Sequence, residues 1–297
     1  MKLKARSVRS VGQLRRWIRE RLSKKYGTEV FDRKLAQLIG GFTKSGNVVL
    51  DHLLDGTTIS YEFGTAIGWQ LFWYGSFEES EIRFVESMLR TRPYVGAIID
   101  VGANIGLHSL RLSKSFSKAD LYAFEPSPPT FMNLQQNIKR SGQNNIIALP
   151  YALSNQVCEK EFFHCEDNAY SSLIDTHRKN VKSVFRVAVT TLDQIVEEQR
   201  IQDVSLIKID VEGLESEVVL GATKTIQKFH PDIFVEIYGG TNSNPEPART
   251  VEILRALGYQ AYVLTEGTAA PYKEHSDEFY NYYFSVNRIQ LDPSLTR

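Results

Sequence analysis

The sequence predicts an α/β fold, with one mostly parallel sheet of seven strands and helices on both of its faces. Short apolar runs alternate with segments of helical periodicity from residue 76 to residue 290, a pattern typical of parallel sheets covered on both sides. A glycine-punctuated turn follows the first run. Acids end three of the runs, and ligands of open α/β sheets bind outside such strand ends.

Each expected strand is a short apolar run bounded by turn or polar residues. The strands fall at residues 98–101, 120–124, 146–151, 206–210, 233–237, 260–264 and 280–286. The helices fall at residues 79–89, 106–114, 129–139, 192–198, 215–221 with a continuation to 228, and 247–257. The long stretch 159–189 between the third and fourth strands reads as an inserted hairpin and a loop around Ser171 and Ser172. Residues 291–297 form a short tail.

The N-terminal segment, residues 1–75, differs in character from the rest of the chain. Residues 1–25 carry ten basic residues and one acid, and apolar residues at spacings of three and four draw one stripe on a helix. Such a helix either packs on the catalytic domain or a second subunit, or lies on an anionic membrane surface. Packing is favoured, because five aliphatic residues are what any docked helix needs. Residues 28–75 read as a small accessory β-element that caps the site.

Composition excludes several classes of protein. Lys+Arg and Asp+Glu both number 35, so no net positive charge recruits nucleic acid. Cys158 and Cys165 lie apart from any histidine pair at metal-ligand spacing, and we expect two reduced thiols. No apolar run is long enough to span a membrane and no secretory signal is evident, so we expect a cytoplasmic protein, with peripheral membrane contact as the alternative.

The turn after the first strand indicates the cofactor. Gly102 and Gly106 enclose it as G-x-x-x-G, whereas a dinucleotide fingerprint reads G-x-G-x-x-G. The carboxylate of Asp100 would repel a pyrophosphate but suits a ligand that carries an ammonium and a sulfonium. Glu125 ends the next strand, where an acid binds both ribose hydroxyls. Together these features favour S-adenosylmethionine over NAD.

Several motifs in the same order resemble FkbM-type S-adenosylmethionine-dependent methyltransferases. They include Asp-Val-Gly-Ala-Asn-Ile-Gly at residues 100–106, Phe-Glu-Pro at 124–126, Thr-Leu-Asp at 191–193 and Lys-Ile-Asp-Val-Glu-Gly at 208–213. The resemblance implies a class I (Rossmann-like) methyltransferase sheet, whose last strand runs antiparallel. It also implies transfer of a methyl group to a hydroxyl of a sugar, a glycolipid or polysaccharide precursor, or a secondary metabolite.

We expect the cofactor to contact residues just past the strand ends. Gly102, Asn104 and Gly106 would surround its methionine part, with Asp100 and Asp210 near the ammonium. Glu125 would hold the ribose beside Pro126 and Ser127. Ala152 and Leu153 would enclose the adenine, with Asn155 or a nearby backbone group at its edge. The family resemblance implies that Glu78 closes over the cofactor.

An alcohol acceptor needs help to lose its proton, so a base or a metal is expected. Asp210, Glu212 and Glu236 stand at the ends of the fourth and fifth strands, and we assign Asp210 as organiser and Glu212 as the candidate base. His108 and His164 are alternative bases. Asp210 with Glu236 is an alternative site for a divalent cation, although no third hard ligand is evident.

Lys208 stands out because its neighbours are apolar strand residues. Its side chain can reach the sheet edge, pair with a carboxylate such as Asp193, or act as a base with a lowered pKa. A structural ion pair is the favoured interpretation.

Three functions are compatible with the sequence. An O-methyltransferase on a sugar predicts an aromatic-rimmed cleft, for which Trp69, Trp73, Tyr74, Tyr170 and Tyr238 are available. A methyltransferase on an amine, peptide or RNA is the second, but the N/D-P-P-Y/F motif common in base methylation is absent after the fourth strand. A non-catalytic cofactor-binding scaffold is the third. The partner is therefore expected to be a small-molecule or glycan acceptor, with a homodimer as a further possibility.

Overall fold

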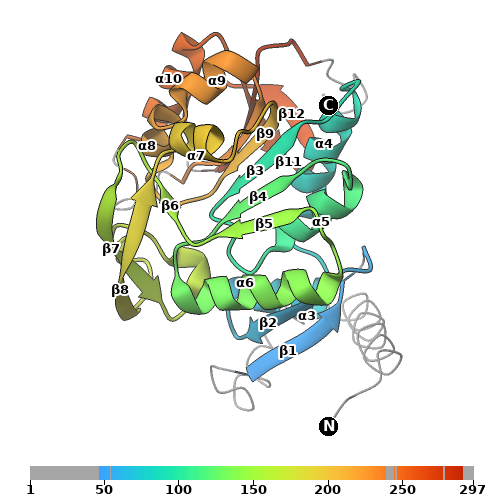
Figure 1. Cartoon of the computed structure of the whole chain (residues 1–297), viewed down its shortest axis with the longest axis vertical. Coiled ribbons are helices and arrows are strands. Elements are labelled where there is room, and N and C mark those ends of the chain that lie inside the picture. The colour runs from blue at the N-terminus through green and yellow to red at the C-terminus, as the bar shows by residue number, and fades with distance from the viewer. Residues whose placement is uncertain (1–46, 54, 239–243, 245, 277, 290–297) are drawn as a thin grey trace. The chain divides into compact units, whose positions relative to one another are not determined.

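The computed structural model describes residues 47–289 except residues 54, 239–243, 245 and 277 (Figure 1). The described residues form two compact units, one of residues up to Phe77 with residues 139–142, and one of the residues from Glu78 onward without those four. The predicted basic helix within residues 1–25 and the tail at 291–297 lie outside the described residues. A membrane or subunit contact of that helix stays a prediction.

The first unit contains a β-hairpin followed by one helix. Strand β1 (Asn47–His52) pairs antiparallel with β2 (Thr58–Phe63), and helix α3 (Ala66–Tyr74) follows. Thr65 caps this helix by accepting a backbone hydrogen bond of 3.0 Å, and Gly75 ends it in the left-handed region at φ 72°. The β-element expected within residues 28–75 contains these two strands, whereas the helix was not predicted.

The second unit is built on a sheet of eight strands. They are β3 (Ala97–Val101), β4 (Leu121–Phe124), β5 (Ile146–Leu149), β9 (Val204–Ile209), β10 (Asp232–Glu236), β11 (Gln260–Thr265), β12 (Thr268–Pro271) and β13 (Asn281–Ser285), in the order β12-β11-β13-β10-β9-β3-β4-β5. β3, β4, β5, β9 and β10 are parallel, and β13 is antiparallel to both of its neighbours. The predicted class I sheet with its antiparallel last strand is confirmed.

The eighth strand, β12, was not predicted. It pairs with β11 through a tight turn at Glu266 and Gly267, whose φ angles are 51° and 75°. Two successive positive φ values are the geometry of a two-residue hairpin turn. The strand is short and ends at Pro271, so its apolar pattern is too brief to be recognised.

Helices cover both faces of this sheet (Figure 1). α4 (Glu79–Arg90), α5 (Leu107–Ser115) and α6 (Pro128–Ser141) share one buried cluster with the sheet, and α7 (Leu192–Glu198), α8 (Glu215–Leu220), α9 (Thr223–Phe229) and α10 (Pro247–Ala256) pack on the other. Successive residues of β3 alternate between the two clusters: Ile98 faces the first group of helices and Ile99 the second. Each such fully buried aliphatic side chain contributes about 1.5–3 kcal/mol.

A second, three-stranded sheet lies in the predicted insertion. β7 (Cys158–Cys165) and β8 (Val181–Thr190) form the expected antiparallel hairpin, and β6 (Ala152–Leu153) pairs parallel with β8. The expectation of one strand over residues 146–151 was wrong at its end, since β5 stops at Leu149. Pro150 has no N–H to donate to a sheet, and the chain crosses there to the second sheet.

The predicted helix continuing from residue 215 to 228 is instead two helices, α8 and α9. The break falls at Gly221, where an added Cβ would lie 1.9 Å from the carbonyl oxygen of Ser154. Asp193 caps the start of α9, because its carboxylate accepts the backbone N–H groups of Lys224 at 3.0 Å and Thr225 at 2.8 Å. The Thr-Leu-Asp motif at residues 191–193 therefore has a structural role here.

We predict that Asp193→Ala lowers the free energy of unfolding by about 1–2 kcal/mol, because α9 loses the cap of its first turn. Urea unfolding followed by circular dichroism measures this loss. Glu197→Ala, an exposed substitution on the same helix as Asp193, is the matched control and should change stability by less than about 0.5 kcal/mol. Equal losses in the two variants would contradict the capping role.

Candidate functional site

A pocket opens at the carboxyl ends of β3, β4 and β9. It is lined by Val101, Gly102, Asn104, Phe124, Glu125, Pro126, Tyr151, Ala152, Leu153, Phe162, Asn168, Ala169, Ser171, Leu173, Asp210, Val211, Glu212 and Leu214. Eight residues that the sequence assigned to the site are among these. The lining does not include Glu78, Asp100, Gly106, Ser127 or Glu236, whose positions are described below.

Backbone packs tightly at the turn after β3. Gly102 has φ 80°, and a Cβ there would lie 1.8 Å from the carbonyl oxygen of Asp210. Asn104 also adopts a positive φ of 50°. Gly106, at φ 94°, begins α5 and lies against the side chain of Leu134 rather than in the pocket. The two glycines are therefore required by the backbone path, and Gly102 alone lines the site.

Glu125 is a buried acid at the end of β4. Its two carboxylate oxygens accept the backbone N–H groups of Asn104 at 3.0 Å and Ser127 at 2.8 Å. Burial raises its pKa to about 7, and the charges of Asp100 and Asp210 add to this effect against the two hydrogen bonds. Each oxygen keeps a second lone pair, so the group can accept two further hydrogen bonds from a ligand in the pocket.

Ser127 and His164 join the turn after β4 to the second sheet. Ser127 Oγ lies 3.1 Å from His164 Nδ1, and both side chains are buried. Burial lowers the pKa of His164, with Lys182 adding to the effect, which keeps the imidazole neutral. The structure thus gives His164, an alternative base in the sequence analysis, a structural hydrogen bond. Asn155, expected at the adenine edge, bonds instead to Glu217 and does not line the pocket.

Lys208 forms the ion pair that was expected, but with different partners. Its Nζ lies 3.1 Å from Asp210 Oδ2 and 3.6 Å from Asp100 Oδ1, and its side chain is only 6% exposed. Burial alone would lower its pKa, but the neighbouring carboxylates raise it above the ordinary value, which makes it a permanent cation. The pairing with Asp193 was wrong, since that acid caps α9. A lysine that stays charged is not a general base.

Asp100 lies behind the pocket wall. Its carboxylate is fully buried, accepts a 2.5 Å hydrogen bond from Ser109 Oγ and forms an ion pair with Lys208. Asp210, in contrast, reaches the pocket from the end of β9 and is partly exposed. The placement of Asp100 near the cofactor ammonium therefore stays a prediction. From its buried position, Asp100 would act on the ammonium through its charge.

Four carboxyl groups gather where β9 and β10 end and α4 begins: Glu78, Asp210, Glu212 and Glu236. Burial, and after it the charge of Asp210, raises the pKa of Glu78 to about 7, that of Glu212 to about 8 and that of Glu236 well above its ordinary value. Glu212 holds a positive φ of 57° in the turn after β9. A site so rich in acids favours a cationic ligand.

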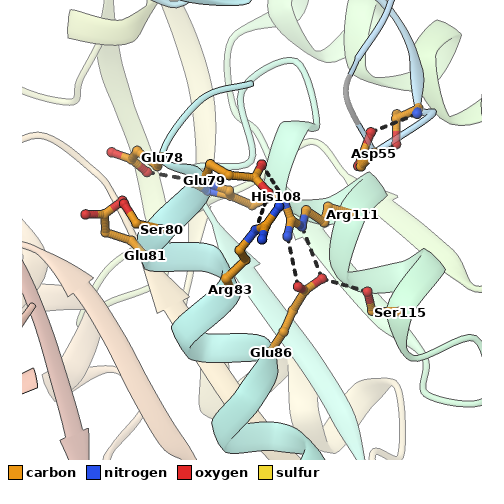
Figure 2. A network of polar contacts seen from close by, with 11 residues as sticks. Asp55, Glu78, Glu79, Ser80, Glu81, Arg83, Glu86, His108, Arg111 and Ser115 are labelled. Atoms are coloured by element: carbon orange, nitrogen blue, oxygen red, sulfur yellow. Dashed lines mark hydrogen bonds and ion pairs between the residues drawn. The ribbon is translucent and has the colours of Figure 1, made fainter. Parts of the chain in front are cut away.

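Glu78 is placed at the head of α4 by contacts with α5 (Figure 2). Its Oε2 lies 3.3 Å from His108 Nε2, and burial lowers the pKa of His108 well below its ordinary value, so the ring is neutral. One turn further on, Arg111 binds Glu79 at 2.5 Å and Glu86 at 2.9 Å (Figure 2). These ion pairs fix α4 against α5 and thereby the position of Glu78.

Arg178 is a site residue that the sequence did not reveal. It precedes β8 and forms an ion pair with Glu212, and its guanidinium lies 4.5 Å from the ring centre of Tyr170 and 4.1 Å from that of Tyr238. No motif marks this arginine, which stands between His177 and Lys179 in the insertion. The two tyrosines were predicted as rim residues.

The aromatic rim is only partly as expected. The ring centres of Trp69 and Trp73 lie 5.8 Å apart within the first unit. Phe63 and Phe72 pack with them, and Trp73 is buried. Their packing serves the core of that unit.

In the described part of the chain, no group of three or more His, Cys, Asp or Glu side chains is placed to hold a metal ion. Cys158 and Cys165 are both free thiols, as expected. No helix in the described ranges has the length and apolar character needed to cross a bilayer.

The fold and the acid-rich pocket define a class I methyltransferase type of protein. Residues 100–261 match the methyltransferase FkbM domain, which is more than half of the chain. The chain therefore belongs to the FkbM methyltransferase family, and S-adenosylmethionine is the cofactor of that family.

Relatives of known name are similar over part of their length. Hexuronic acid methyltransferase AglP of Haloferax volcanii is 32% identical over 143 residues, which are 48% of this chain and 56% of AglP. Methyltransferase 1 of Beauveria bassiana is 25% identical over 192 residues, 59% of this chain and 76% of the relative. The chain thus spans little more than half the length of AglP. Among solved structures, Methyltransferase FkbM from Methylobacillus flagellatus is similar over 67% of this chain and 47% of its own chain. The sequence identity is 15% and the TM-score is 0.42.

We predict that Gly102→Ala destabilises the protein by at least about 2 kcal/mol more than Gly258→Ala does. Both glycines have a positive φ, 80° and 90°, so both variants incur the same backbone penalty. Only at Gly102 would the new Cβ meet backbone, because nothing lies within 4 Å of a Cβ at Gly258. Urea unfolding of both variants measures the difference, and similar losses would refute the close approach.

We predict that the ligand-free protein loses stability as the pH rises from about 4.5 to about 8. The pKa values of Glu78, Glu125 and Glu215 are raised to about 7 and that of Glu212 to about 8, against an ordinary 4.5, so the folded state binds more protons than the unfolded chain in this window. His108 and His164 act in the opposite direction because their pKa values are lowered, but Glu236, whose pKa is also raised, joins the four glutamates.

Urea unfolding at pH 5, 6, 7 and 8 measures this slope. Glu215→Gln keeps a hydrogen-bond acceptor for the Gly213 N–H but removes one titrating carboxyl, so its stability should fall less steeply. Stability that rises over the same range, or a Glu215→Gln slope equal to that of the natural chain, would show that these groups titrate normally.

Proposed function

We propose that the protein is an S-adenosylmethionine-dependent O-methyltransferase that acts on a hydroxyl of a sugar or of a glycolipid or polysaccharide precursor. The observation that carries this is the pairing of the buried Glu125 carboxylate with the acid-rich end of β9 in one pocket. Family membership supports the methyl donor. The similarity to a hexuronic acid methyltransferase supports a carbohydrate acceptor.

The residues present fit the methyl donor. Glu125 lines the pocket with unused acceptor capacity on both oxygens, which suits the two hydroxyls of a ribose. Ala152, Leu153 and Phe162 offer apolar surface for an adenine beside it. Asp210 brings a further carboxylate to the same pocket, where it would face the ammonium. When bound, S-adenosylmethionine supplies an activated methyl group on a sulfonium, whose positive charge the surrounding acids favour.

The protein's own contribution is to orient the acceptor and to take its proton. Glu212 lines the pocket, and with its pKa raised to about 8 it is a stronger base than an ordinary glutamate. The ion pair with Lys208 holds the Asp210 carboxylate in place, and Asp210 would orient the ligands around it. We assign Glu212 as the general base, with Glu236 as the second candidate on the neighbouring strand. Asp210 and Glu236 as a metal pair lack a third ligand among the described residues.

Two other functions are weighed against this one. Methylation of an amine, a peptide or an RNA base would use the same ribose site and would differ only in the acceptor. A non-catalytic scaffold would bind the cofactor without turnover. The raised pKa of Glu212 in the pocket favours an enzyme, because perturbed carboxyls gather at catalytic sites.

Calorimetric titration with S-adenosylmethionine, S-adenosylhomocysteine and NAD tests the cofactor, and methyl transfer from labelled donor to a panel of sugars tests the reaction. Saturable binding of the adenosyl compounds alone is expected, followed by label in a base-stable ether product. Binding of NAD alone would overturn the proposal. Cofactor binding with transfer only to amines or RNA would replace the acceptor class, and binding without any transfer would favour the scaffold.

We predict that Glu125→Ala weakens binding of S-adenosylhomocysteine at least about 100-fold, because two hydrogen bonds to a carboxylate are lost. The variant should keep its circular dichroism spectrum. Glu252→Ala, an exposed acid on α10, is the matched control and should bind as the natural protein does. Unchanged affinity in a folded Glu125→Ala protein would remove the ribose assignment.

A further inference from the structure

Arg178 is held as a cation by three segments that are distant in the sequence. Tyr170 from the 3₁₀ turn η1 (Asn168–Tyr170) and Tyr238 after β10 enclose its guanidinium, with ring centres at 4.5 Å and 4.1 Å. Glu212, from the turn after β9, forms an ion pair with the guanidinium. Two aromatic faces fix the plane of a guanidinium at a small entropic cost.

The arginine keeps donors for a further ligand. Only its Nη1 is used in the ion pair with Glu212, its side chain is 25% exposed, and a guanidinium has five N–H donors in a fixed fork. That fork matches the two oxygens of a carboxylate or phosphate. Because Glu212 lines the cofactor pocket, Arg178 stands beside the place where acceptor and methyl donor meet.

The charge balance of the site also favours this use. Glu78, Glu212 and Glu236 are largely buried, and their raised pKa values leave each of them protonated in part of the molecules at neutral pH. Lys208 is paired with Asp100 and Asp210. The ammonium of Lys179 lies 5.2 Å from the ring centre of Tyr170, but Arg178 is the residue there that combines partial exposure with a guanidinium fork.

We propose that Arg178 selects the acceptor by binding an anionic oxygen group of the sugar, a carboxylate or a phosphate, and that this exchange releases Glu212 to face the hydroxyl that is methylated. The inference rests on the proposed function and names the acceptor class: a sugar acid or sugar phosphate rather than a neutral sugar.

The exchange couples recognition to catalysis. While Arg178 pairs with Glu212, the carboxylate is neutralised and is a poorer base; once the guanidinium turns to the acceptor, the proton affinity of Glu212 rises. In molecules whose Glu212 is ionised, the acceptor oxygen then forms its bond to the methyl carbon, the sulfur–methyl bond breaks with its electron pair left on sulfur, and the hydroxyl proton passes to the Glu212 carboxylate. An acceptor without an anionic group would leave Glu212 paired with Arg178.

Arg186 on β8 shows what an ordinary surface pair looks like in this chain. Its Nε lies 3.1 Å from Glu159 Oε2, and the two side chains are 78% and 65% exposed. Exposed pairs of this kind contribute little to stability. Arg186→Gln is therefore the matched control for Arg178→Gln: the same substitution, in the same insertion, away from the site.

The test is calorimetric titration of the protein saturated with S-adenosylhomocysteine, using methyl β-glucuronide, glucose 6-phosphate and methyl β-glucoside as probes. Saturation with S-adenosylhomocysteine is measured first, so a failure of the proposed function is seen before any acceptor is added. We expect one of the two anionic probes to bind at least about 10-fold more tightly than the glucoside. Arg178→Gln should remove that preference, while Arg186→Gln keeps it.

Proton uptake on binding is the second readout, obtained by repeating the titration at pH 8 in buffers of different ionisation enthalpy. The titratable and charged groups around Glu212 are Asp210, Glu215, Glu236, Tyr170, Cys165 and Arg178. Because Glu212 loses its cationic partner, binding should take up a fraction of a proton, and Glu212→Gln should abolish the uptake.

Preference for the glucuronide would identify a carboxylate, and preference for glucose 6-phosphate a phosphate. Three results would overturn the proposal: no binding of either anion to the loaded natural protein, equal binding of the neutral glucoside, or an anion preference that survives in Arg178→Gln. Should that variant fail to fold, Arg178→Lys keeps the charge and loses the fork, and an unreduced preference in it would equally contradict selection by the guanidinium.

Discussion

The buried ammonium of Lys208, between Asp100 and Asp210, is the interaction on which the site depends. It joins β3 to the end of β9 at the point where both strands reach the pocket. Lys208 and Asp100 are removed from water and Asp210 is partly so, and buried charges are stable only when paired, because each alone would carry a large desolvation penalty. Their mutual attraction holds the carboxyl end of the sheet in one arrangement, and the turn at Gly102 can then pack its backbone against Asp210.

The same set decides how the other acids behave. The charge of Asp210 adds to burial in raising the pKa of Glu125, Glu212 and Glu236. Lys208 opposes this effect at Glu236 but is already shared by two partners. The outcome is a site whose acids are poised to titrate near neutrality, which favours a ligand that brings positive charge and a reaction that moves a proton.

The sequence was sufficient to predict features that arise from local patterns. Apolar runs and helical periodicity located seven strands of the main sheet, and the position of Glu125 at a strand end predicted an acid in the pocket. It did not separate Asp100 from Asp210: Asp100 lies within β3 and is fully buried, whereas Asp210 lies just past β9 and lines the pocket. Arg178 was missed for a related reason: its partners come from distant segments, and no spacing along the chain encodes a guanidinium between two rings.

That difference explains why the part of the site at the strand ends is predictable and the surroundings of Arg178 are not. Most of the pocket is lined by strand ends and the first turns after them, where the parallel sheet dictates the geometry, and Phe162 and Asn168 are added from the insertion between β6 and α7. Arg178 and Tyr170 also lie in that insertion, and Tyr238 lies two residues past the end of β10. The ion pair of Arg178 with Glu212 therefore joins the insertion to the turn after β9, and the acceptor specificity that we propose for this chain depends on that pair.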